Sequence, residues 1–124
     1  MKTVRVEIDE REYILCCPIS VMKELNEHFG GIEKIDELFN YGDLSTIVDE
    51  SMWILSTFMR AGERYAEKNG IECSKALTVE QLQDVCDIET LFDLRESLFE
   101  IMSASTKQEI ELEPQKENGA TPGE

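Results

Sequence analysis

Apolar and polar residues alternate along residues 2–8, and a polar turn and the short apolar run "YILCC" follow. A period of two is typical of a half-buried β-strand, so the pattern predicts a β-hairpin over residues 1–17. A lone two-stranded hairpin is marginally stable in water, and we therefore expect it to pack against the rest of the chain. The residues that share the apolar face of the first strand are Val4, Val6 and Ile8.

Residues 18–103 show a helical period instead, with apolar positions three or four residues apart. Pro18 suits the first turn of a helix, and the pair Gly30-Gly31 is a stop signal. A short amphipathic segment at residues 32–39 follows, before the break at "NYGD". The apolar stripe expected on the first helix consists of Ile19, Met22, Leu25 and Phe29.

The longest helical pattern covers residues 44–69 and should form the spine of the fold. Asp43 is placed to cap its start, and Gly70 follows its end. Its stripe combines bulky apolar residues with one glycine. The members of this stripe are Leu44, Ile47, Val48, Leu55, Phe58, Met59, Gly62, Tyr65 and Ala66.

Trp53, the only tryptophan, does not belong to this stripe. At about 100° per residue it lies roughly 160° from Leu55, among polar side chains such as Asp49 and Arg64. Three interpretations compete: it is covered by the hairpin or the C-terminal tail, it is covered by a partner protein, or it is stacked by Arg60 and otherwise exposed. We favour an internal cover formed by the hairpin.

The segment "LTVEQL" carries two signals for the start of a helix. Thr78 and Gln81 are spaced as a capping box, and Leu77 and Leu82 are spaced as a hydrophobic staple. The helix that starts here either continues to about residue 103 or breaks near Cys86-Asp87. We favour the break, with Asp87 capping a last helix that runs to about residue 103. The apolar positions expected on that helix are Ile88, Leu91, Leu94, Leu98, Ile101 and Met102.

The composition changes after residue 103, where prolines and polar residues replace aromatic ones. Such a segment buries too little apolar surface to offset its ordering entropy, so residues 106–124 are predicted to form a flexible, acidic tail. Within it "EIELE" alternates, as an edge strand would. The expected fold is mainly α (a small α+β fold): one domain over residues 1–105, with the hairpin at 1–17 packed on a bundle of four to five helices at 18–103.

Charge narrows the classes of partner. The chain has 124 residues, with 27 acidic against 12 basic side chains and a net charge of −15. This balance argues against nucleic acid or an anionic membrane as a direct partner. We expect no secretion signal and no membrane span, because no long apolar run occurs. The four cysteines form no C-x-x-C pair, which favours reduced thiols and a cytoplasmic location.

Catalytic signals are weak in this sequence. His28 is the only histidine, and a surface position near a helix end is the simplest explanation for it. The acidic clusters do not match an EF-hand loop, and no phosphate-binding or dinucleotide-binding glycine motif occurs. We therefore expect a protein that is not an enzyme and needs no cofactor or metal.

The segment "DESMWILSTFMRAGERYAEKNG", followed by "LTVEQLQDVCDIETL", resembles the tail assembly chaperones of long-tailed bacteriophages and of prophages in Gram-positive bacteria. Members carry an "ALWLLSTMMxAGxRYAxxxG"-like helix, matched here by residues 52–59 and 61–66. A strand-like start, a "FGG" stop and a capped "LTxExLxDxxD" helix match as well. The resemblance covers roughly residues 10–105 and rests on packing positions.

The resemblance implies a non-enzymatic role in the host cytoplasm. Such chaperones bind the tape measure protein, keep it soluble, and recruit tail tube subunits without remaining in the mature virion. In many phages a frameshifted longer form is thought to contact the tube protein. The candidate contact residues in this chain are Trp53, Arg60 and Arg64, with Met52 and Met59 as an adaptable apolar lining.

The alternative is an acidic decoy that imitates nucleic acid and binds a host DNA-binding protein. The net charge of −15 motivates it. A mimic should present its carboxylates as one ordered surface array. Here the acids are spread over several predicted helices and alternate with lysines and arginines, which is more typical of a solvated surface.

Overall fold

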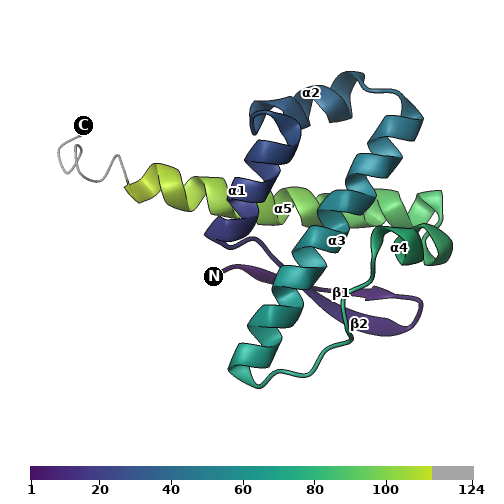
Figure 1. The fold of residues 1–124 in the computed structure, drawn as a ribbon, viewed down its shortest axis with the longest axis vertical. Coiled ribbons are helices and arrows are strands. Elements are labelled where there is room, and N and C mark those ends of the chain that lie inside the picture. Colours follow the sequence, from purple (N-terminus) through teal and green to yellow (C-terminus); the bar gives the residue numbers. More distant parts are fainter. Residues whose placement is uncertain (113–124) are drawn as a thin grey trace.

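The computed structural model describes residues 1–112, with side chains over residues 1–104. It confirms the predicted class, a two-stranded hairpin packed on helices. Helix α3 runs the length of the molecule, α5 crosses it, and the hairpin lies beside the lower part of α3 (Figure 1). The elements are β1 (Thr3–Ile8), β2 (Arg11–Cys16), α1 (Ile19–Phe29), α2 (Glu33–Tyr41), α3 (Leu44–Asn69), α4 (Val79–Val85) and α5 (Ile88–Leu112).

The hairpin is antiparallel, with Val6 opposite Tyr13 and Ile8 opposite Arg11. Its two-residue turn is formed by Asp9 and Glu10, whose φ angles are 53° and 66°. Positive φ at both central positions gives a turn whose twist matches that of the strands. The predicted hairpin is therefore present, and only two residues separate its strands.

The two strands are buried to different extents. Strand β1 is covered on one face only, as its alternation predicted, with Val6 and Ile8 buried between exposed residues. Strand β2 is covered on both faces from Tyr13 to Cys16, which explains why its sequence does not alternate. Helix α3 packs on β2, and α5 packs on β1.

Gly62 is the point at which the hairpin comes closest to α3. A Cβ atom at this position would lie 1.7 Å from the carbonyl oxygen of Ile14 and 3.1 Å from the amide nitrogen of Leu15. No side chain fits there, so this glycine is required by the approach of one backbone to another. The stripe of α3 therefore serves as the docking surface for β2.

The predicted helix starts after residue 77 are confirmed. The Thr78 side chain accepts from the Gln81 amide at 3.1 Å, and the Gln81 side chain accepts from the Thr78 amide at 3.0 Å. The break between α4 and α5 lies where expected, and Asp87 Oδ1 accepts from the Thr90 amide at 2.8 Å. Asp43 stands at the start of α3, but its side chain makes no capping hydrogen bond.

Three apolar residues assigned to helical stripes are exposed instead of buried: Ile19, Leu44 and Ile88. Each is the first residue of its helix, and Ile88 also lies about 120° from Leu94, beside the buried stripe of α5 and not on it. On α1 the buried residues are Val21 and Leu25.

Helix α5 continues to Leu112, beyond its expected end near residue 103. The proposed edge strand is therefore wrong for residues 109–112, which are helical; glutamate, glutamine and leucine favour a continuing helix. The expected boundary between domain and tail at residue 105 falls inside this helix. The remaining part of the predicted flexible tail, residues 113–124, lies outside the described residues.

No helix in the described range is long and apolar enough to cross a membrane.

Replacing Gly62 with alanine tests the docking of the hairpin. At an exposed position in a helix, replacing glycine with alanine stabilises the helix by about 1 kcal/mol, because alanine is the better helix former. Here the clash with the Ile14 carbonyl should reverse the sign and destabilise the fold by about 2 kcal/mol or more. Urea unfolding measures the difference, with exposed Ser45→Ala on the same helix as a control. A stabilised Gly62→Ala variant would contradict the packing.

Asp87 provides a pH-dependent test of the α5 cap. Hydrogen bonds from Thr90 lower the pKa of its carboxyl group, so the cap stabilises the fold above the ordinary aspartate pKa and is lost as pH falls through the lowered value. The stability difference between wild type and Asp87→Ala should therefore shrink in acid. Asp87→Asn keeps a neutral capping oxygen, and its advantage over Asp87→Ala should not change with pH. An unchanged gap between wild type and Asp87→Ala in acid would exclude the charged cap.

Candidate functional site

Trp53 is covered from within the protein, by the last turn of α1. The His28 ring stacks on it with a centroid distance of 3.7 Å and an interplanar angle of 10°. The Phe29 ring meets it edge-on at 5.9 Å and 84°. Trp53 is therefore half-buried, and the ring contacts that cover it come from α1 and not from the hairpin.

The geometry of α3 explains why the hairpin does not cover Trp53. Nine residues separate Trp53 from Gly62, which at about 100° per residue places them roughly 180° apart on the helix. The hairpin docks at Gly62 and therefore lies on the opposite side. A second element was needed for the tryptophan, and α1 supplies it.

His28 joins α1 to α3 by two kinds of contact. Besides stacking on Trp53, its Nε2 atom lies 2.7 Å from Oε1 of Glu50 on α3. Glu50 and Trp53 lie about one helical turn apart on α3, so the single imidazole ring of His28 contacts both. His28 thus holds the last turn of α1 against α3.

Two cysteines are disfavoured as nucleophiles. Burial raises the pKa values of the Cys16 and Cys86 thiols, which keeps both protonated at neutral pH.

Arg60 does not stack on Trp53, so the third interpretation of the tryptophan is wrong. Its Nη2 atom donates to Thr57 Oγ1 at 3.1 Å, and that hydroxyl donates to the Trp53 carbonyl oxygen at 2.8 Å. Arg60 and Arg64 are both exposed. They remain available to a partner, whereas Trp53 offers only the part of its ring that α1 leaves open.

The prediction that Met52 and Met59 line a contact surface is wrong. They are only 2% and 1% exposed and belong to the core. Both lie within about 60° of Leu55 on the helix, on the side that packs against the hairpin and α5. Their side chains fill internal space, which is the usual role of methionine at helical spacing.

The connector before α4 covers another side of α3. Ser56 Oγ donates to the Leu77 carbonyl oxygen at 2.8 Å, and the Ala76 amide donates to Glu63 Oε1 at 2.9 Å. The first bond satisfies the hydroxyl of buried Ser56, and the second holds the half-buried connector against α3. The middle of α3 is thus surrounded by the hairpin, α1, α5 and this connector.

The ends of helices at one edge of the molecule are less well covered, and sequence reasoning missed this. The α2–α3 corner and the α4–α5 corner lie on the same side in Figure 1. Tyr41 and Leu44 are 86% and 60% exposed, and Phe92 is 49% exposed. We call the exposed apolar residues of these two corners the corner surface. It consists of Tyr41, Leu44, Val85, Ile88 and Phe92.

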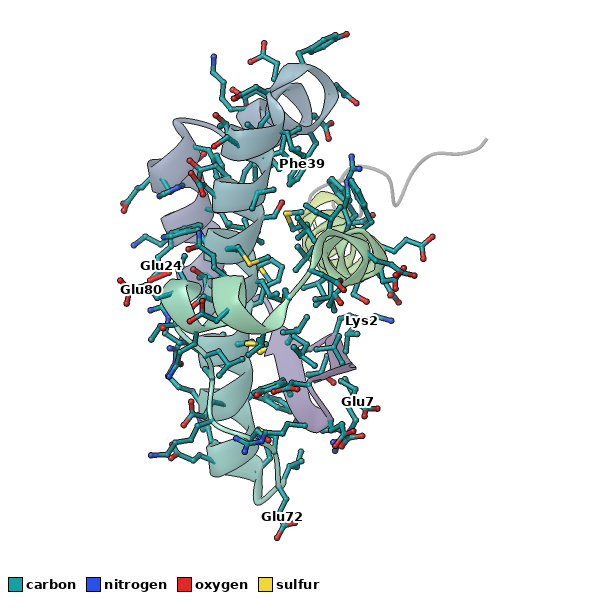
Figure 2. The ribbon with its side chains drawn as sticks, turned by 90° about the vertical axis from the view of Figure 1, so that its right-hand side faces the viewer. Lys2, Glu7, Glu24, Phe39, Glu72 and Glu80 are labelled. Carbon is teal, nitrogen blue, oxygen red and sulfur yellow. The ribbon has the colours of Figure 1, made fainter. Side chains whose placement is uncertain are left out.

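Aromatic contacts join α2 to α5 next to this surface. The Phe39 ring meets the Phe99 ring edge-on at 5.2 Å, and the Arg95 guanidinium lies 5.2 Å from the Phe39 centroid and 5.8 Å from that of Phe99. Figure 2 shows Phe39 between the upper helices and α5. A shallow depression on α5 adjoins these contacts, and Phe92 and Glu96 also line it.

Negative charge is concentrated in the segments that form the two corners. Residues 33–50 contain six acidic residues and one lysine, and residues 84–96 contain five acidic residues and one arginine. Residues 57–70, toward the other end of α3, contain two acidic and three basic residues. The exposed apolar side chains therefore lie in the most acidic part of the fold.

Over the described residues, no group of three or more potential metal ligands is present.

Comparison with family models, with curated proteins and with solved structures finds no match to this chain. The candidate sites must therefore be judged on their geometry. That geometry gives two surfaces: the partly covered Trp53 face with Arg60 and Arg64, and the corner surface.

The contribution of the contact between Trp53 and α1 to the free energy of unfolding can be measured by mutation. Trp53→Ala should destabilise the fold by about 2–3 kcal/mol, because a large half-buried ring is removed from beneath α1. Combined with His28→Ala in a double-mutant cycle, it should show a coupling of about 0.5–1.5 kcal/mol. Tyr41→Ala removes an exposed aromatic ring and should change stability by less than about 0.5 kcal/mol. If Trp53→Ala costs no more than this control, the internal cover is excluded.

Proposed function

We propose that this protein is a tail assembly chaperone of a long-tailed bacteriophage or prophage. It binds the tape measure protein in the host cytoplasm, keeps it soluble, and helps to recruit tail tube subunits without entering the mature virion. The proposal rests on the resemblance of residues 10–105 to that family. It involves no catalysis, cofactor or nucleic acid.

The positions that carry the resemblance have defined roles in packing, which supports the proposal. Trp53 lies beneath α1, Gly62 admits the hairpin backbone, and Thr78 caps α4. A chain with the same residues at these positions would meet the same constraints on how its elements pack. The resemblance therefore concerns the residues on which this fold depends.

The surface chemistry also suits a chaperone of helical chains. Such a protein needs a strongly hydrated exterior and an apolar region that a client can contact. The net charge of −15 supplies hydration and self-repulsion, and the corner surface supplies exposed apolar side chains. Recruitment of the tail tube protein would involve a longer, frameshifted form, as the family resemblance implies.

The net charge motivates the acidic decoy, but the distribution of the acidic residues does not favour it. Acidic residues occur on every element, and in Figure 2 the labelled Glu7 and Glu72 lie far from each other and from Glu24 and Glu80, which appear close together in this view. Ion pairs interrupt them, as between Arg5 and Glu12 at 3.1 Å. This is the pattern of a solvated surface and not of a single duplex-like array.

Co-expression tests the proposal. The tape measure protein of the same phage or prophage should be insoluble when produced alone, and it should be soluble and co-purify when produced together with this chain. An unrelated acidic protein of similar size serves as the control for charge alone. If the tape measure protein is equally insoluble in all three cases and nothing co-purifies, the proposed function is wrong.

A further inference from the structure

We propose that the corner surface binds an amphipathic helix of a partner whose apolar stripe is flanked by lysine and arginine. This inference rests on the proposed function in one respect: the natural source of the helix would be the tape measure protein. The location and chemistry of the surface follow from this chain alone.

The first argument is the spacing of side chains on α5. Its buried stripe faces the hairpin and α3, but a second row runs beside it at intervals of four, three, four and three residues. Alternating steps of three and four are the spacing of a seam that packs against another helix. The members of this row are Ile88, Phe92, Arg95, Phe99 and Met102.

This second row is covered at one end only. Phe99 is partly buried, because Phe39 of α2 packs on it, whereas Phe92 is 49% exposed and Ile88 is exposed as well. Helix α2 thus occupies part of a helix-packing seam and leaves its first two turns open. A partner helix could continue the seam where α2 ends.

On helix α3, too, an apolar row passes from buried to exposed along the helix. Its stripe passes through Leu55 and Ser51, which are fully buried, to half-buried Val48 and then to Leu44, which is 60% exposed. The stripe therefore emerges from the core at the α2–α3 corner. The apolar rows of α3 and α5 are thus open at the first turns of the two helices, and these helix starts lie on the same side of the molecule (Figure 1).

Charge complementarity identifies the occupant. Asp93 and Glu96 line the depression beside Phe92, and Glu37 lies beside Tyr41 in a second depression with Lys34. The surrounding segments are strongly acidic, as described above. Carboxylates along an apolar seam favour a helix with basic flanks, by steering its approach and by pairing at the rim.

The same chemistry disfavours two other occupants. Residues 113–124, "EPQKENGATPGE", contain no large apolar side chain and more acidic than basic residues, so they cannot fill the seam. A second copy of this chain would bring two acidic surfaces together, with like-charge repulsion.

Two designed peptides test the inference. Each is a 21-residue amphipathic helix with leucine at steps of three and four; one carries lysine and arginine beside the stripe, and its twin carries glutamate. Fluorescence anisotropy with the full chain should show binding of the basic peptide that weakens with salt, and affinity for the twin at least about tenfold lower. Equal binding of both peptides would overturn the charge argument.

Variants locate the site. Leu44→Ser and Phe92→Ser should each weaken binding of the basic peptide by about tenfold, as expected for interface anchors. Ile19→Ser makes the same kind of change at an exposed apolar residue of α1 and should leave affinity unchanged. Because Leu44 and Phe92 are both exposed, the two variants should still fold. Trp53 fluorescence can verify that they are folded. If the corner variants bind as wild type does, or Ile19→Ser weakens binding equally, the assignment is wrong.

Further outcomes separate this inference from the proposed function. If the tape measure protein co-purifies equally well with wild type and with the corner variants, the function stands and the surface is wrong. If wild type binds the basic peptide but does not hold the tape measure protein, the surface stands and the function is wrong. If sedimentation shows a dimer that Leu44→Ser abolishes, the occupant is a second copy and the inference is overturned.

Discussion

The arrangement of this protein depends on the contact between the backbone of β2 and helix α3 at Gly62. A two-stranded hairpin has little stability of its own, and this contact gives it a surface on which to pack. It also fixes which side of α3 the hairpin occupies. Trp53 is then on the opposite side and requires α1, whose final turn contributes His28 and Phe29.

The open end of α3 follows from the lengths of the elements. A helix of 26 residues is about 39 Å long, and strands of six residues are about 20 Å long. The hairpin, docked around Gly62, therefore covers only part of the stripe. Helix α5 crosses farther along, and the first turn of α3 extends beyond both. The exposed apolar residues at the corners are a consequence of this limited coverage, and the acidic residues around them provide hydration and a preference for basic partners.

Local signals in the sequence predicted local structure well. The alternation of β1, the capping box at Thr78 and the cap at Asp87 are each determined by a few neighbouring residues, and all were found as expected. The coverage of each helix was harder to predict, because a helical wheel gives the direction of a side chain and not the reach of its neighbours. Leu44 illustrates this limit, because it continues the core stripe of α3 and is nevertheless exposed. The contact role predicted for Met52 is wrong for another reason: it rests on the adaptability of methionine, although the wheel already places Met52 near Leu55 in the core.

We propose that the partner helix docks on the acidic, apolar corners, where large apolar side chains are exposed, and that the exposed Arg60 and Arg64 do not contact it. Site-specific photo-crosslinking of the complex with the tape measure protein tests this most directly. A photoreactive residue in place of Tyr41 or Phe92 should cross-link to the client, and one in place of Arg60 or Arg64 should not. Cross-linking from the arginine positions alone would contradict the account.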